Sequence, residues 1–339
     1  MPNIAASLLL ALASRRIKGG GVIVNEHTLN AAQTRLHVEV LARWFDFIRL
    51  EQLATRLDEP KERPFCLLTF DDGKRSNFTQ TAPELERLGV PAVFYVTTQA
   101  VTTGSYLWFD LREQLVRALG FCPPGIDLAT LKRLPLTLLL ARLERAWRDY
   151  LPQKRLIAGC PEPGSNEPPA SDEADGQDDL RLMSWDEVAS LARRGFTIGA
   201  HGLSHAILTR EPREQAFAEI EQSVAAVTSR IGAPCATFAW PNGNYNDELL
   251  EHALRCGVST VMTTEPAWVD GGASLHRLPR IQLFGSSSRA HIESKIALAA
   301  FRGVLPNPNG SGRAYSFPPR EAGRTSYGTR EAQAPMRAV

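Results

Sequence analysis

Short apolar or β-branched runs alternate with longer amphipathic stretches along most of this sequence, and this alternation constrains the fold more than any other feature. Strands that alternate with helices build βα units and a parallel sheet. Seven runs have the length and composition of buried strands: residues 21–24, 65–70, 92–97, 196–200, 236–240, 258–262 and 280–284. We therefore predict an α/β protein whose seven strands nearly close a barrel.

The stretches between the strands carry signals for the start and the end of helices. Ser184 and Glu187 form a capping box, and the helix that they open is expected to end at Arg194, before a glycine. Further helices are expected over residues 81–89, 212–231 and 246–256. Each of them ends at or beside a glycine that returns the chain to a strand.

Two regions depart from this alternation of predicted strands and helices. Residues 105–183 hold a Leu- and Arg-rich helical section (111–150) and then a segment, 160–179, that is rich in Pro, Gly and acidic residues and has almost nothing to bury. We interpret 105–183 as a helical and partly disordered insertion. The chain is thus expected to comprise an N-terminal segment (1–19), one domain (20–303) with this insertion, and a disordered tail (304–339).

Charge and cysteine content exclude two classes of protein. The 339 residues include 38 basic and 37 acidic side chains, so no global field attracts the chain to nucleic acid or to an anionic membrane. The five cysteines are an odd number without CxxC spacing, which argues against a disulfide framework. A neutral or weakly charged molecule is the expected partner.

The N-terminal stretch IAASLLLALAS (4–14) has the length of a signal-peptide core, but no Lys or Arg precedes it. We therefore expect a cytoplasmic protein, with export to the periplasm or cell surface as the alternative. Elsewhere no segment approaches the roughly 20 apolar residues of a membrane helix, so no integral membrane segment is expected.

Two adjacent carboxylates, Asp71 and Asp72, end the predicted strand 65–70, and Gly73 follows them. The carboxyl ends of parallel strands are where α/β proteins build their sites. Because consecutive strand residues point to opposite sides, the two carboxylates cannot easily share one task. One can bind a metal while the other takes a proton, although this stretch alone is equally compatible with a helix cap.

A second strand end carries two of the seven histidines, His201 and His205, four residues apart. Two imidazoles and one carboxylate form a zinc site that leaves one coordination position open for water. An HxxxH spacing is weak evidence by itself, but its occurrence together with the Asp pair in one βα chain favours a joint metal site.

A third strand end reads FAWPNGNYND, residues 238–247. Trp240, Pro241 and Gly243 predict a stiff exposed turn in which the amide of Asn242 can serve as an oxyanion donor. The alternative is an ordinary Pro-Asn-Gly turn without a chemical role.

Together these stretches resemble the polysaccharide deacetylase family, the carbohydrate esterases with a NodB-homology domain. The matching pieces are LLTFDDG, AVFYVTT, MSWDEVASLARRGFTIGAHGLSHAILT, FAWPNGNYND and LPRIQL, in the family's order, over about residues 20–300. The resemblance implies a distorted (β/α)7-type barrel and a divalent metal, most often zinc. It also implies hydrolysis of N-acetyl groups on a saccharide of an exopolysaccharide or of the cell envelope.

Residue by residue, the resemblance assigns Asp71 as the general base. It assigns the metal to Asp72, His201 and His205. The backbone amide of Asn242 takes the place of the family's oxyanion donor. An arginine that often orients the base in this third motif is replaced here by Phe238.

The family also uses a histidine as general acid, in a late motif that RIQLFGSSS (280–288) lacks. Some members carry this histidine on the first strand, where GVIVNEHTL places His27. His27 is therefore the expected acid and His276 the second choice. Sugar stacking is a possible role for Trp108, Trp240 and Tyr245, against packing in the core.

Three other functions stay open at this level. The same metal, base and oxyanion donor can cleave a small-molecule amide or an O-acetyl ester, because they do not dictate the leaving group. The missing arginine and the missing late histidine are also compatible with a catalytically inactive saccharide-binding protein. A purely structural βα scaffold, with the charged residues only capping helices, is the third.

Overall fold

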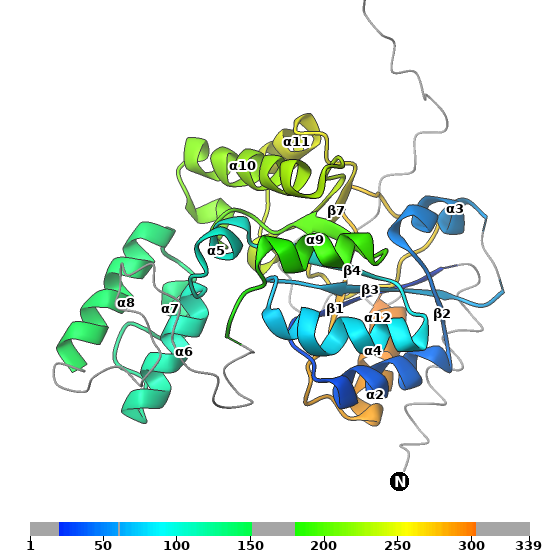
Figure 1. Ribbon diagram of the computed structural model, residues 1–339, viewed down its shortest axis with the longest axis horizontal. Helices are drawn as coiled ribbons and strands as arrows, with labels where there is room; N and C mark the ends of the chain where they lie inside the picture. The colour runs from blue at the N-terminus through cyan, green and yellow to red at the C-terminus, as the bar shows by residue number, and fades with distance from the viewer. Residues whose placement is uncertain (1–19, 60–61, 151–179, 303–339) are drawn as a thin grey trace, which may run out of the picture.

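The computed structural model describes residues 20–59, 62–150 and 180–302 (Figure 1). The N-terminal segment 1–19, the acidic segment 160–179 and the tail 304–339 lie outside these residues, so the expectations of disorder and of a cytoplasmic location stay predictions. Within the described residues, no helix has both the length and the apolar character needed to cross a membrane.

One parallel sheet forms the centre of the molecule, in the order β7-β6-β5-β4-β3-β1-β8, with β2 paired to β3 outside this path. A single parallel bridge between Met262 and Leu278 joins β7 to the segment that leads into β8. The predicted α/β class and distorted seven-stranded barrel are thus confirmed. The strands are β1 (Gly21–Glu26), β2 (Asp46–Phe47), β3 (Phe65–Phe70), β4 (Ala92–Val96), β5 (Thr197–Ala200), β6 (Thr237–Ala239), β7 (Thr260–Met262) and β8 (Ile281–Gln282).

Most helices cover the outside of this sheet, while Leu53 and Leu57 of α3 (Leu53–Asp58) pack with the inward-facing strand residues; the caps of α9 (Trp185–Arg193) and α11 (Asp247–Arg255) agree with the sequence signals. Ser184 and Glu187 form the predicted capping box, and the Asn246 side chain accepts from the backbone N–H of Leu249. The other helices around the sheet are α2 (Ala31–Ala42), α4 (Ala82–Leu88), α5 (Thr98–Thr103), α10 (Arg213–Ile231) and α12 (Arg289–Arg302). Short 3-10 or π turns are η1 (Leu50–Gln52), η2 (Asn77–Thr81), η3 (Leu208–Arg210) and η4 (Pro241–Gly243).

The predicted helical section of the insertion forms a separate module beside the barrel (Figure 1). It consists of α6 (Trp108–Leu119), α7 (Leu128–Leu131) and α8 (Leu136–Tyr150). Leu115, Ile126 and Leu131 belong to its own apolar core. The module therefore has a core of its own, and it contacts the barrel domain through the starts of α6 and α8, where the Leu136 backbone N–H donates to Glu211 Oε1 at 2.6 Å.

Side chains of β3 alternate between two cores, as strand geometry requires. Cys66, Leu68 and Phe70 pack in the layer between sheet and helices, whereas Phe65 and Leu67 face the barrel interior. Asp71 continues the inward-facing row, because it follows Phe65, Leu67 and Thr69 at intervals of two. The alternation of the strand thus directs this carboxylate into the mouth of the barrel.

Candidate metal and catalytic site

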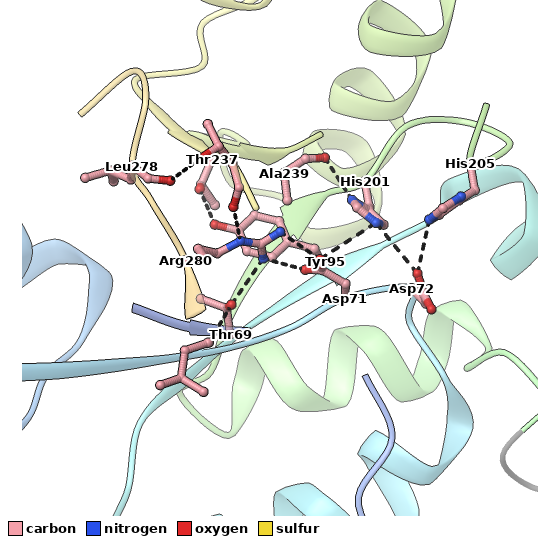
Figure 2. Close-up of polar contacts among 12 residues, drawn as sticks. Thr69, Asp71, Asp72, Tyr95, His201, His205, Thr237, Ala239, Leu278 and Arg280 are labelled. Carbon is pink, nitrogen blue, oxygen red and sulfur yellow. Dashed lines mark hydrogen bonds and ion pairs between the residues drawn. The ribbon is translucent and has the colours of Figure 1, made fainter. Parts of the chain in front are cut away.

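The predicted site residues of two strand ends come together at the carboxyl rim of the barrel (Figure 2). Asp71 and Asp72 follow β3, while His201 and His205 follow β5. All four side chains are buried. β4 lies between the two strands in the sheet, so the residues meet above the carboxyl end of β4.

Asp72, His201 and His205 are arranged as a three-donor metal site. The Asp72 Oδ1 atom lies 3.6 Å from His201 Nε2 and 3.4 Å from His205 Nε2. One nitrogen or oxygen from each residue falls within 4.8 Å of the others. Asp72 Oδ1 is buried and has no hydrogen-bond partner among the described residues, which is an expensive arrangement unless a cation binds there. The donor set fits a divalent metal such as zinc.

His201 is held in the tautomer that a metal needs. Its Nδ1 lies 2.8 Å from the carbonyl oxygen of Ala239, which can only accept, so Nδ1 carries the proton and Nε2 presents a lone pair. Burial lowers the pKa of His201 to about 4, although the charges of the two aspartates act in the opposite direction. The imidazole is therefore neutral at neutral pH, as a ligand must be.

The pKa of Asp72 shifts in the complementary direction. Burial alone would raise it, but the charge of His27, followed by those of the two imidazoles facing Asp72, lowers it well below its usual range. Asp72 is therefore an anion at neutral pH. A buried carboxylate that stays ionised beside the His201 and His205 nitrogens favours a cation in this pocket.

Glu219 of α10 fixes the loop that carries both histidines. Its carboxylate accepts from the backbone N–H of Leu203 at 2.8 Å and of Ser204 at 3.0 Å, and also from the Ser204 hydroxyl. Glu219 is itself buried. A buried carboxylate that receives three donors orders the loop between His201 and His205.

The start of α6 supports His205 from the other side. The Trp108 indole donates from Nε1 to the His205 carbonyl oxygen at 3.2 Å, and the Phe109 ring packs edge-on against the His205 imidazole at 5.0 Å. Asp110 forms a buried ion pair with Lys74, which lies two residues after Asp72. Trp108 is therefore a buried support rather than an exposed sugar platform, and the insertion contributes to the walls of the site.

Backbone strain marks the same residues. The non-glycine residues with positive φ in the described part of the chain are Asp72 (74°), His205 (60°) and Asn242 (56°). This conformation costs roughly 1–2 kcal/mol at each residue and persists where the surrounding structure enforces it. All three belong to the predicted site, and strain of this kind concentrates at functional sites.

Asp71 has a partner of its own, Arg280. The guanidinium binds the carboxylate with both nitrogens, Nη1 to Oδ1 at 2.7 Å and Nη2 to Oδ2 at 2.8 Å (Figure 2). Burial would raise the pKa of Asp71, but the charge of Arg280 and then that of His201 outweigh it and lower this pKa. Asp71 Oδ2 also lies 3.9 Å from His201 Nε2. The carboxylate is thus kept ionised beside the metal ligands.

The sequence argument missed Arg280. This fully buried residue precedes β8, and it also bonds to the carbonyl oxygen of Thr263 and to the Thr69 hydroxyl, at 2.9 and 3.1 Å. The place where the third motif lacks its arginine holds Phe238, which is buried in the sheet–helix layer. The available signal was an arginine at the start of the predicted strand RIQLF, but nothing in the sequence connects it to Asp71.

The structure brings His27 to the site and leaves His276 outside it. His27 follows β1 at the rim, and its charge acts on both Asp71 and Asp72. His276 is exposed, and its backbone N–H bonds to Ser274 within the same loop. Of the two candidates for the acid, only His27 interacts electrostatically with the two carboxylates.

The third strand end differs in part from expectation. Asn242 takes the left-handed conformation of a tight turn, and its side-chain amide bonds to Asn244 rather than to the rim. Trp240 is fully buried, and Tyr245 stacks on it with centroids 5.6 Å apart. The prediction that the Trp240 face receives a sugar is therefore wrong, because the ring is fully packed in the core. The half-buried Tyr245 retains some exposure.

A family model described as polysaccharide deacetylase matches residues 58–261, which span all four rim residues and the turn at Asn242. The chain belongs to the polysaccharide deacetylase family. This result confirms the resemblance drawn from LLTFDDG and the HxxxH motif.

Several known proteins resemble this chain in sequence or in fold. YxkH of Bacillus subtilis (strain 168), whose name assigns it provisionally to the polysaccharide deacetylases, is 26% identical over 116 residues; the match covers 33% of this chain and only 42% of that protein. The Streptococcus pyogenes deacetylase PplD, solved in complex with acetate, superimposes with a TM-score of 0.55 at 14% identity, over 83% of this chain and 99% of that one. IcaB from Ammonifex degensii superimposes with a TM-score of 0.52 at 13% identity, over 83% and 97% of the two chains. At these identities the structures establish the shared fold.

Proposed function

We propose that the protein is a metal-dependent deacetylase that hydrolyses N-acetyl groups of a polysaccharide or glycan intermediate. The observation that carries this proposal is that two adjacent carboxylates have different partners. Asp72 faces two imidazoles, and Asp71 is held by Arg280. One side chain is thus equipped to hold a metal and its neighbour to take a proton.

Asp72, His201 and His205 would hold the metal, for which we propose Zn²⁺. Three protein ligands leave a coordination position for water or substrate, which is the composition of catalytic rather than structural zinc sites. When bound, the metal would act as a Lewis acid toward the attacking water and the acetyl carbonyl.

The remaining residues supply proton transfer and charge stabilisation. Asp71 would take the proton of the attacking water, and Arg280 keeps this carboxylate ionised and fixes both of its oxygens. The backbone N–H of Asn242 is the proposed donor to the carbonyl oxygen as it gains negative charge. His27 would give a proton to the departing sugar amine, since an amine anion is a poor leaving group.

Arg280 also bears on the alternative of an inactive saccharide-binding protein. That alternative rested on a missing arginine and a missing late histidine. Arg280 reaches Asp71 from the segment before β8, and the charge of His27 acts on both carboxylates. Both departures from the family pattern are therefore compensated, which favours the enzyme.

Acetate release from N-acetylglucosamine oligomers tests the proposal directly. The wild type loaded with zinc should release acetate, and Asp71→Asn should lose at least about a hundredfold in rate while it keeps its metal. Asp186→Asn, an exposed aspartate on α9, serves as the matched control and should behave as wild type. Release from O-acetylated but not from N-acetylated saccharides would favour the esterase alternative. No release from any of them, with metal bound, would favour the binding protein.

A further inference from the structure

A second group of metal-ligand residues lies on the outer helices, away from the strand ends. Among the described residues, Glu221, His252 and Cys256 offer one donor atom each within 4.8 Å of one another. Glu221 belongs to α10, and His252 and Cys256 lie four residues apart at the end of α11. The two helices run beside each other in Figure 1, so the group spans their contact.

His252 is the buried centre of this group. Its Nε2 atom lies 2.9 Å from Glu221 Oε1, yet the atom is buried and makes no hydrogen bond of acceptable geometry within the described residues. Phe217, one turn before Glu221 on α10, stacks flat on the imidazole with centroids 3.8 Å apart and planes 5° apart. The ring is therefore held with Nε2 close to the Glu221 carboxylate but not in line with a hydrogen bond to it.

The thiol of Cys256 completes the set. It is partly buried and free of any disulfide, and Glu221 is exposed, so the group is reachable from solvent. Burial, and then the charge of Glu221, raise the pKa of Cys256. A thiol with a raised pKa is a poor nucleophile, which argues against a reactive-cysteine site. A bound cation would instead offset the repulsion between carboxylate and thiolate.

From this geometry we infer that Glu221, His252 and Cys256 form a second, surface site for a borderline-soft divalent cation such as Zn²⁺. One carboxylate oxygen, one imidazole nitrogen and one thiolate are zinc ligands, and water completes a tetrahedron. Binding releases the thiol proton to solvent, because the thiolate is the ligand. The site is independent of the proposed reaction at the barrel rim.

Arg255 opposes metal binding in the ion-free arrangement. Its Nη2 lies 3.3 Å from His252 Nδ1, and a guanidinium can only donate, so the imidazole proton sits on Nε2. Coordination through Nε2 requires the other tautomer, and Arg255 must then move away. Glu251, 3.9 Å from Arg255 Nη1, offers it an alternative partner. Removal of this guanidinium should therefore strengthen metal binding.

Cobalt titration of the full chain distinguishes this site from the rim site. Co²⁺ bound to a thiolate gives a ligand-to-metal charge-transfer band, and the rim site contains only oxygen and nitrogen donors. We expect this band in the wild type and in Cys122→Ser, the control for an exposed thiol of the helical module. The band should vanish in Cys256→Ser, and His252→Gln should weaken cobalt binding at least tenfold. Arg255→Gln should tighten it about tenfold.

The number of zinc ions bound per chain and the rate of acetate release provide two further tests of this site. Zinc should displace cobalt and abolish the band, and Cys256→Ser should bind one zinc fewer per chain while it releases acetate at the wild-type rate. A band that persists in Cys256→Ser, or equal zinc stoichiometry in the two proteins, would overturn the inference. These readouts stand even if no acetylated saccharide proves to be a substrate, so the failure of one proposal is separable from that of the other.

Discussion

At the scale of single residues, the site depends on two neighbouring carboxylates that differ through their partners rather than through their chemistry. Asp71 continues the inward row of β3, and Asp72 leaves the strand with a positive φ. Their opposite directions could be predicted from strand alternation alone. The partner of Asp71 could not, because Arg280 lies 209 residues further along the chain. A contact of that separation depends on closure of the barrel, which no local pattern encodes.

Replacement of Arg280 tests how the base is held. Arg280→Met leaves a buried carboxylate without its counter-charge, so we expect destabilisation by about 3–5 kcal/mol and at least a hundredfold loss in the rate of acetate release. Arg280→Lys keeps the charge but loses the two-point contact, and it should fold better and recover part of the rate. Rates are compared with zinc content measured in the same samples. A fully active Arg280→Met would contradict a positioning role.

The identity of the general acid is a second prediction at this scale. His27→Ala should lower the rate of acetate release by about 10²–10⁴-fold without loss of zinc, because it removes proton donation to the leaving amine. His276→Ala, an exposed histidine in the loop before β8, should leave the rate unchanged. The reverse pattern would assign the acid to His276.

At the scale of elements, local signals predicted the helices that have clear caps, whereas α2, α3, α5, α12 and the shortest strands went unrecognised. Ser184 and Asn246 begin helices where their side chains predicted, because a cap is a contact over three residues. β2 has only two residues and went unrecognised, and the expected strand 280–284 is reduced to Ile281–Gln282. Such short strands are defined by their neighbours in the sheet rather than by their own composition.

The role of α10 in ordering the histidine loop leads to a prediction at this scale. Glu219→Gln keeps the shape of the side chain but loses the charge that receives three donors from Leu203 and Ser204. We expect zinc to bind about 10–100-fold more weakly, as is usual when a group that orients metal ligands is removed. Competition with a chelator measures this affinity. Glu214→Gln, exposed on the same helix, is the control, and an equal affinity in both variants would contradict the prediction.

The helical module provides a parallel test. Trp108→Phe retains an aromatic ring at the start of α6 but loses the Nε1 donor to the His205 carbonyl oxygen. The loss of one buried hydrogen bond, about 0.5–1.5 kcal/mol, should weaken zinc binding several-fold. Trp147→Phe, which lies in the module's own core on α8, should keep wild-type affinity. If both variants bind zinc equally well, the insertion does not support the metal ligand.

At the scale of the whole molecule, the βα rhythm was sufficient to predict the barrel, because each strand is a buried run and each helix an amphipathic one. The pairing of the site residues then follows from the fold, since β3 and β5 end at the same rim. The alternation of strands and helices does not predict the free-energy cost of burying polar and charged side chains at that rim. Asp71, Asp72, His201 and His205 are all buried, and a charged cluster of this kind destabilises the metal-free chain.

Metal should therefore stabilise the folded molecule as a whole. Free zinc at about 100 times its dissociation constant adds about 2.7 kcal/mol to the free energy of unfolding, which raises the melting temperature by about 5–10 °C for a domain of this size. In Asp72→Asn most of this shift should disappear, because the anionic ligand between the two imidazoles is lost. Cys256→Ser should retain it, since the rim site is intact there. Thermal unfolding with and without a chelator measures the shift, and an unchanged shift in Asp72→Asn would remove the metal from the rim.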